Sequence, residues 1–121
     1  MPKSFNINIE EKIGCIWITF NDSIDMDNYK LIEDEIFHKI KSDTPRNIVL
    51  DLSKTSALFS SGIGLIIRLH SFVEKFNKKI YLVNVSQKVS DSFIMTGLNA
   101  VLTIFSTEEE FKKKICSDSD N

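Results

Sequence analysis

Cysteine is scarce in this chain of 121 residues: the only two, Cys15 and Cys116, lie far apart in the sequence. They cannot form a C-x-x-C pair, so the sequence supports neither a zinc ribbon nor a thioredoxin-type redox site. Cys15 falls within an apolar strand pattern, where a thiol commonly packs as a small hydrophobic side chain. We therefore expect no metal site built on cysteine.

Long hydrophobic runs and an excess of positive charge are also missing. No apolar stretch approaches the roughly 20 residues of a membrane-spanning helix, and residues 1–6 lack the apolar core of a signal peptide. Lys and Arg total 15 against 17 Asp and Glu, which leaves no basic field to attract nucleic acid. These absences predict a cytoplasmic protein without membrane insertion or nucleic-acid binding, whose partners are proteins or small ligands.

The residue combinations that carry catalysis are absent as well. The chain has two histidines, His38 and His70, and neither stands near a plausible nucleophile in the sequence. No Gly-rich phosphate loop, H-E-x-x-H or G-x-S-x-G motif occurs. The sequence therefore predicts a protein that is not an enzyme and that needs no cofactor or metal.

The apolar residues that are present indicate regular structure along the whole chain. Alternation of apolar and polar residues predicts a strand over residues 5–10, and a more apolar run predicts a second strand over residues 15–20, joined to the first by a tight turn into a hairpin. Asp25 is a plausible N-cap for a helix whose apolar stripe recurs at three- and four-residue steps. That stripe consists of Tyr29, Ile32, Ile36 and Ile40.

Three further strands alternate with helices in the rest of the chain. The strands are predicted over residues 47–52, 79–85 and 101–105, and the first two are followed by helices over residues 63–76 and from Ser86 to Gly97. Thr107 and Glu110 form a capping-box pattern that opens a last helix. Strands separated by helices are parallel neighbours, so we expect an α/β fold.

The most informative segment is Ser60-Ser61-Gly62, directly before the long apolar helix. Unpaired N–H groups at a helix start suit a serine that caps the helix and equally suit a serine that carries phosphate. Gly62 and Gly64 each cost helix propensity, about 1 kcal/mol relative to Ala, and they suggest that something approaches the backbone closely. Residue chemistry alone leaves capping and phosphorylation both open.

The helix over residues 63–76 carries more apolar residues than one core face needs. At 100° steps the core face consists of Leu65, Ile66, Leu69, Phe72, Val73 and Phe76, while Ile63 and Ile67 point away from it. An exposed apolar pair beside Ser60 would make a docking surface, and the alternative is that a neighbouring segment covers both isoleucines.

Asp51 stands at the carboxyl end of a predicted parallel strand, where α/β proteins place active sites. A receiver domain has a similar size, but it needs more acidic residues after its first strand and a lysine after its last. The chain offers only Glu10 and Glu11, in the hairpin. We therefore interpret Asp51 as a residue that stabilises a turn.

In series, these motifs resemble the STAS family, whose best-known soluble members are bacterial anti-sigma factor antagonists. The resemblance rests on Asp51-Leu-Ser, then Ser61-Gly-Ile-Gly-Leu65 after seven residues, Ile80-Tyr-Leu-Val-Asn-Val-Ser86, Phe93-Ile-Met-Thr-Gly-Leu98 and Leu102-Thr-Ile-Phe105. It implies one STAS domain over residues 1–116 and a polar tail over residues 117–121. It also implies an N-terminal hairpin leading into a mixed, mostly parallel sheet with about four helices packed against it.

The resemblance further implies a partner switch. In these antagonists the serine after the loop aspartate is phosphorylated, which assigns that role to Ser60, with Ser61 as second choice. Phe59, Ser61, Gly62, Ile63 and Ile67 would contact the partner. That partner would be an anti-sigma factor with serine kinase activity, bound only by the unphosphorylated form, and a PP2C-type phosphatase would reverse the modification.

The chain departs from this pattern at Phe59, which occupies the position of the loop aspartate. Loss of that carboxylate weakens the case for phosphorylation. The alternative function is therefore a STAS module that is never phosphorylated and acts as a scaffold, a ligand sensor or an accessory subunit of a transporter.

Overall fold

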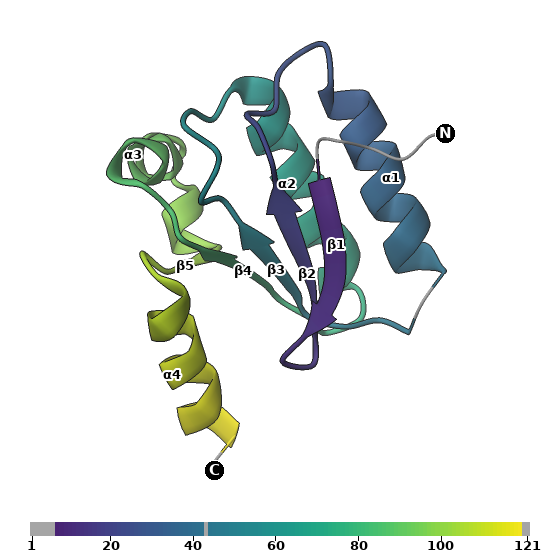
Figure 1. The fold of residues 1–121 in the computed structure, drawn as a ribbon, viewed down its shortest axis with the longest axis vertical. Coiled ribbons are helices and arrows are strands. Elements are labelled where there is room, and N and C mark those ends of the chain that lie inside the picture. Colours follow the sequence, from purple (N-terminus) through teal and green to yellow (C-terminus); the bar gives the residue numbers. More distant parts are fainter. Residues whose placement is uncertain (1–6, 43, 120–121) are drawn as a thin grey trace.

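A five-stranded mixed sheet organises the chain (Figure 1). This computed structural model describes residues 7–42 and 44–119. Strands β1 (Ile7–Lys12) and β2 (Cys15–Phe20) form an antiparallel hairpin. Strands β3 (Ile48–Asp51), β4 (Ile80–Val83) and β5 (Thr103–Ile104) then add in parallel, in the order β1-β2-β3-β4-β5. The predicted hairpin and mostly parallel sheet are confirmed.

Four α-helices and one 3-10 turn connect or follow these strands. They are α1 (Tyr29–Lys41), α2 (Ser60–Glu74), α3 (Gln87–Thr96), the turn η1 (Leu98–Ala100) and α4 (Glu108–Ser119). Among the described residues, no helix is long and apolar enough to cross a membrane. Helix α4 continues past residue 116 to Ser119 and shows no break at the predicted end of the domain. The domain boundary at residue 116 stays a prediction.

Local signals at the ends of α3 and α4 act as the sequence indicates. The hydroxyl of Ser86 accepts a hydrogen bond from the Val89 N–H at 3.3 Å, and Gly97 ends α3 with a φ of 77°. The Thr107 hydroxyl accepts from the Glu110 N–H at 3.1 Å. The Glu110 carboxylate returns to the N–H of Ser106 rather than to that of Thr107, so the capping box is shifted by one residue.

Alternation along the strands divides the apolar side chains between two faces of the sheet. Ile16, Ile18 and Phe20 of β2 belong to the larger core cluster, which α1, α2 and α3 share with one face. Trp17 and Cys15 belong to a smaller cluster that contains Phe111 of α4. Helix α4 therefore covers the opposite face, where the rings of Trp17 and Phe111 meet edge to face at 5.7 Å.

Several predictions about where elements begin and end are wrong. Strand β5 has two residues rather than five, because the N–H groups of Val101 and Leu102 both bond the Leu98 carbonyl in the turn after Gly97. Phe76, assigned to the core face, is exposed and lies beyond the end of α2. Asp25 does not cap α1; its carboxylate accepts from the N–H groups of Asp27 and Asn28 in the turn before the helix.

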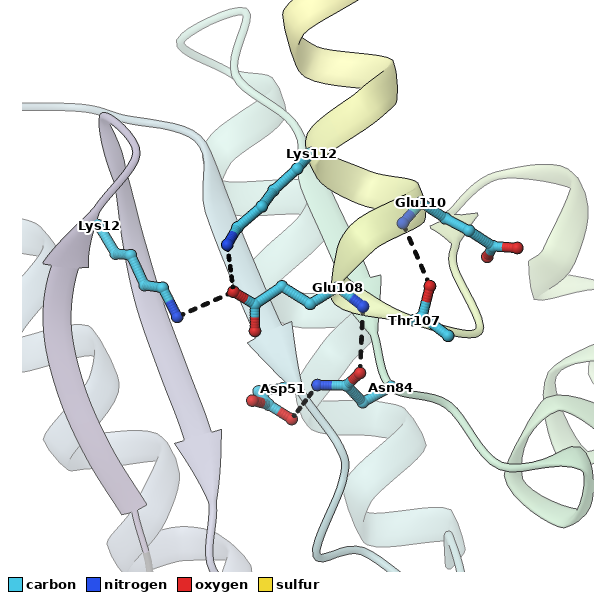
Figure 2. Close-up of polar contacts among 7 residues, drawn as sticks. All are labelled: Lys12, Asp51, Asn84, Thr107, Glu108, Glu110 and Lys112. Carbon is cyan, nitrogen blue, oxygen red and sulfur yellow. Dashed lines mark hydrogen bonds and ion pairs between the residues drawn. The ribbon is translucent and has the colours of Figure 1, made fainter.

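The predicted role of Asp51 is confirmed by its hydrogen bonds (Figure 2). Its Oδ1 accepts from the Ser53 N–H at 3.0 Å and from the Asn84 amide at 3.2 Å, so it stabilises the turns after β3 and β4. Asn84, with a φ of 58°, accepts in turn from the N–H of Glu108 at 3.1 Å. This chain of bonds fixes the start of α4.

Ion pairs hold the same end of α4 to the hairpin. The Glu108 carboxylate lies 3.1 Å from the ammonium groups of both Lys12 and Lys112 (Figure 2). Hydrogen bonding to Lys112, then to Lys12, holds the pKa of Glu108 below its ordinary value, against the effect of burial.

Candidate functional site

Helix α2 begins at Ser60, three residues earlier than the sequence predicts. The N-cap is Phe59, which has an extended backbone and no side-chain hydrogen bond to the helix. The first helical hydrogen bond runs from the Ile63 N–H to the Phe59 carbonyl, at 3.0 Å. Ser60 and Ser61 are therefore the first two helical residues, and neither caps the helix.

The two serines differ in accessibility. Ser60 is exposed. Ser61 is partly buried, and its hydroxyl oxygen is shielded from solvent without a hydrogen-bond partner in the described part of the chain. Ser60 is thus open to solvent, whereas the Ser61 hydroxyl is covered.

A row of apolar side chains runs along α2 next to the serines. Ile63 and Ile67 are spaced by four and lie on one face of α2, and Phe59 is the extended N-cap residue directly before the helix. Phe59 is 50% exposed and Ile67 is 42% exposed. Exposure of both isoleucines was expected; it is confirmed for Ile67 but wrong for Ile63, which is partly buried and packs against the core.

Gly62 is buried, so it offers no surface to a partner. A Cβ at this position would lie 3.1 Å from Cδ1 of Leu58 and 3.3 Å from Cβ of Ile24. The close approach suggested by the glycine is therefore made by side chains of this chain. Its predicted partner contact is not a direct one.

Two adjacent hollows meet at the serines. The first, which we call the Phe59 hollow, has a volume of about 340 Å³ and is lined by Asp25, Met26, Asp27, Phe59, Ser60 and Ser61. The second, the Arg68 hollow, has a volume of about 260 Å³ and is lined by Met26, Tyr29, Ser60, Ser61, Gly64 and Arg68. The turn before α1 thus joins the start of α2 in one surface.

Met26 was missed by sequence reasoning. It is 80% exposed and lines both hollows, and a flexible thioether side chain adapts well to a partner surface. Its only sequence signal is an apolar residue placed between Asp25 and Asp27 in a polar turn.

Arg68 and Glu33 were missed as well. The guanidinium of Arg68 donates from Nε and Nη2 to the two carboxylate oxygens of Glu33, at 2.6 and 2.7 Å. This pair ties α2 to α1, and the hydrogen bond to Glu33 raises the pKa of Arg68. The positive charge therefore stays fixed at the Arg68 hollow.

The side chains that line the two hollows define the chemistry of this surface. Across residues 7–42 and 44–119, no cluster of three or more His, Cys, Asp or Glu side chains could hold a metal ion. Neither His38 nor His70 lines the Phe59 or Arg68 hollow. The surface offers an exposed serine, apolar side chains, the carboxylates of Asp25 and Asp27 and the cation of Arg68.

The STAS domain family matches residues 6–111 of the sequence. The chain belongs to the STAS domain family. A relative from Staphylococcus aureus (strain NCTC 8325 / PS 47), named anti-sigma-B factor antagonist, is 25% identical over 100 residues, covering 82% of this chain and 93% of the relative.

Solved STAS structures share the fold of this chain. The anti-sigma factor antagonist SpoIIAA, in its unphosphorylated form, has a TM-score of 0.75 and 22% identity, over 92% of this chain and 96% of that one. An anti-sigma factor antagonist from Mycobacterium paratuberculosis has a TM-score of 0.74 and 20% identity, over 91% and 92%. The expected STAS architecture is confirmed.

Proposed function

We propose that this STAS domain is a partner-switching regulator of the anti-sigma factor antagonist type. Unphosphorylated, it binds an anti-sigma factor that is also a serine kinase; phosphorylated on Ser60, it is released, and a PP2C-type phosphatase restores it. It acts in the cytoplasm and catalyses no reaction itself. The observation that carries this proposal is the exposed hydroxyl of Ser60, which begins α2 without capping it.

The surroundings of Ser60 suit a protein partner. The half-exposed Phe59 and the exposed Met26 border the same hollow as the serine, and Ile67 continues the apolar row along α2. Side chains of this kind contribute strongly to protein interfaces when they become buried. The name of the Staphylococcus aureus relative, anti-sigma-B factor antagonist, supports an anti-sigma factor as the class of partner.

Phosphorylation would change this surface more than it changes the fold. A phosphoserine adds a charge of about −1.5 to −2. The first N–H groups of α2 have no helical partner and favour a nearby anion, so the domain tolerates the modification. A partner that covers the apolar row must instead desolvate the phosphate. A penalty of about 3 kcal/mol weakens binding roughly a hundredfold.

Affinity measurements with the cognate anti-sigma factor test the proposal. We expect Ser60→Asp to weaken binding by about tenfold or more, since it places an anion at the edge of the apolar row. Ser60→Ala should bind at least as tightly as the wild type and should stay bound in the presence of ATP. Equal affinities for the wild type and Ser60→Asp would overturn the switch. Ser53→Asp, at an exposed serine outside both hollows, is the matched control.

One observation favours the second candidate, a STAS scaffold, sensor or transporter subunit that is never phosphorylated. Phe59 occupies the position at which the anti-sigma factor antagonists that the sequence resembles carry the loop aspartate. Its side chain is half exposed beside Ser60. The variant Phe59→Asp separates the two candidates. If the cognate kinase modifies Ser60 only in Phe59→Asp, the wild-type domain acts without phosphorylation. If it modifies both proteins, the switch is supported.

A further inference from the structure

Arg68 lies on the same side of α2 as Ser60. Ser60, Gly64 and Arg68 are spaced by four, so they form a second row beside the apolar one. All three line the Arg68 hollow. Long helical side chains lean toward the N-terminus of their helix, which directs Arg68 back toward the serine.

Gly64 provides the space for this arrangement. A Cβ at Gly64 would lie 3.2 Å from Nη1 of Arg68 and 3.8 Å from its Cζ. The guanidinium thus lies over the glycine, one helical turn from Ser60. Cβ positions four residues apart on a helix are about 5–6 Å from each other. A phosphate on Ser60 and an N–H group of Arg68 lying over Gly64 can together span this distance.

Glu33 leaves one edge of the guanidinium available. It occupies Nε and Nη2, whereas Nη1 makes no hydrogen bond within the described residues. The Glu33 contact also fixes the plane of the guanidinium, which reduces the entropy lost when another oxygen binds. Arg68 is therefore oriented before any ligand arrives.

We propose that Arg68 is the receptor of the phosphoryl group on Ser60, binding it through Nη1 while Glu33 keeps hold of Nε and Nη2. This inference rests on the proposed phosphorylation of Ser60. It makes Arg68 a positioning residue that holds the phosphate over the start of α2. Asp25 and Asp27 line the Phe59 hollow on one side of Ser60 and oppose the charge of a phosphate there. Arg68 is the cation that lines the Arg68 hollow on the other side of the serine, where Glu33 is its ion-pair partner.

The test uses the full chain with phosphoserine incorporated at position 60 during translation, so no kinase is required. The phosphate pKa is then measured by a ³¹P chemical-shift titration. We expect Arg68→Gln to raise this pKa by about half a unit or more, because a nearby cation favours the dianion. Arg68→Lys should give a smaller rise, since it keeps the charge and loses the planar fork.

Lys30→Gln is the matched control, because it removes one positive charge from the start of the neighbouring helix α1, outside the hollow. It should move the phosphate pKa by less than Arg68→Gln does. Equal shifts in the two variants, or no shift in Arg68→Gln, would overturn the inference. Circular dichroism of each variant establishes that it is folded.

The outcome is independent of the partner switch. If Arg68→Gln raises the phosphate pKa but the cognate kinase never modifies Ser60, the anion site exists and the proposed function is wrong. If the kinase modifies Ser60 but the phosphate pKa is the same in the wild type and in Arg68→Gln, the switch stands and the receptor role is wrong.

Discussion

The Nη1 atom of Arg68 lies 3.2 Å from the point where a Cβ on Gly64 would stand. Cζ and Nη2 of the same guanidinium both lie 3.8 Å from that point. The glycine therefore costs helix stability and leaves room for a charged group. A substitution at Gly64 therefore tests whether the position of the Arg68 guanidinium affects the stability of the fold.

Gly64→Ala should stabilise the domain by up to about 1 kcal/mol, because alanine is the better helix former. The guanidinium is the end of a half-exposed side chain, and at 3.2 Å it has to shift by only a few tenths of an ångström, which its contact with Glu33 can follow. The measurement is urea unfolding followed by the fluorescence of Trp17, the single, buried tryptophan. A lower unfolding midpoint would show that the place of Arg68 matters to the fold.

Gly62→Ala should have the opposite effect. Its Cβ would meet Leu58 at 3.1 Å and Ile24 at 3.3 Å, and both side chains are buried and cannot move freely. Overpacking of this kind costs about 1–3 kcal/mol, which exceeds the gain in helix propensity. Gly64→Ala is the control in the same unfolding experiment. A midpoint equal to or above that of the wild type would contradict the close packing of α2 on the turn before α1.

Ile13→Asn should stabilise the hairpin. Ile13 has a φ of 55° and is followed by Gly14 with a φ of 73°, the backbone of a two-residue turn that prefers Asn-Gly. The left-handed conformation costs a β-branched residue about 1–2 kcal/mol of conformational energy. The Ile13 side chain is 43% exposed, so its replacement removes little buried apolar surface. We expect a gain of about 1 kcal/mol in the free energy of unfolding.

Ile13→Val is the matched control for the hairpin, since valine is also β-branched and should bring no comparable gain. If the asparagine variant is no more stable than the valine variant, the strain assigned to this turn is wrong.

The domain should lose the stability that Glu108 contributes when the pH is lowered. The pKa of Glu108 is lower in the folded protein than its ordinary value, first because of Lys112 and then because of Lys12. A lowered pKa contributes stability above the unfolded pKa, and this contribution is lost as the pH falls through the folded pKa. At pH 7, Glu108→Gln should therefore be less stable than the wild type, by less than about 1 kcal/mol because the pairs are near the surface.

The stability difference between these two proteins should shrink as the pH drops below the ordinary pKa of 4.5. Urea unfolding at a series of pH values measures it. A difference that is constant from neutral to acid pH would contradict the assigned ion pairs, because only the ionised Glu108 can make them.

The strands and most helices could be predicted because their signals are local. The apolar run over residues 15–20 marks β2, and the serine and glycine at the two ends of α3 mark its bounds. The start of α2 was misplaced because Gly62 and Gly64 argue against a helix. Packing of Gly62 under Leu58 outweighs that propensity, and this contact cannot be seen in the sequence.

Part of the site could be predicted because its residues lie close together in the sequence, and the rest depends on contacts between distant segments. Ser60 and Ile67 of α2 and the N-cap residue Phe59 are exposed, as the predicted docking surface requires. Met26 joins them only because the turn after β2 folds against the start of α2. The pairing of Arg68 with Glu33 joins residues 35 positions apart, and no periodic pattern indicates it.

The most direct test of the central claim is the site of phosphorylation. Wild type and Ser60→Ala are incubated with ATP and the cognate anti-sigma factor kinase, and intact mass is measured together with peptide mapping. The account predicts one phosphate on the wild type, located on Ser60, and none on Ser60→Ala. An unmodified wild type, or a phosphate on both proteins at another residue, would contradict it.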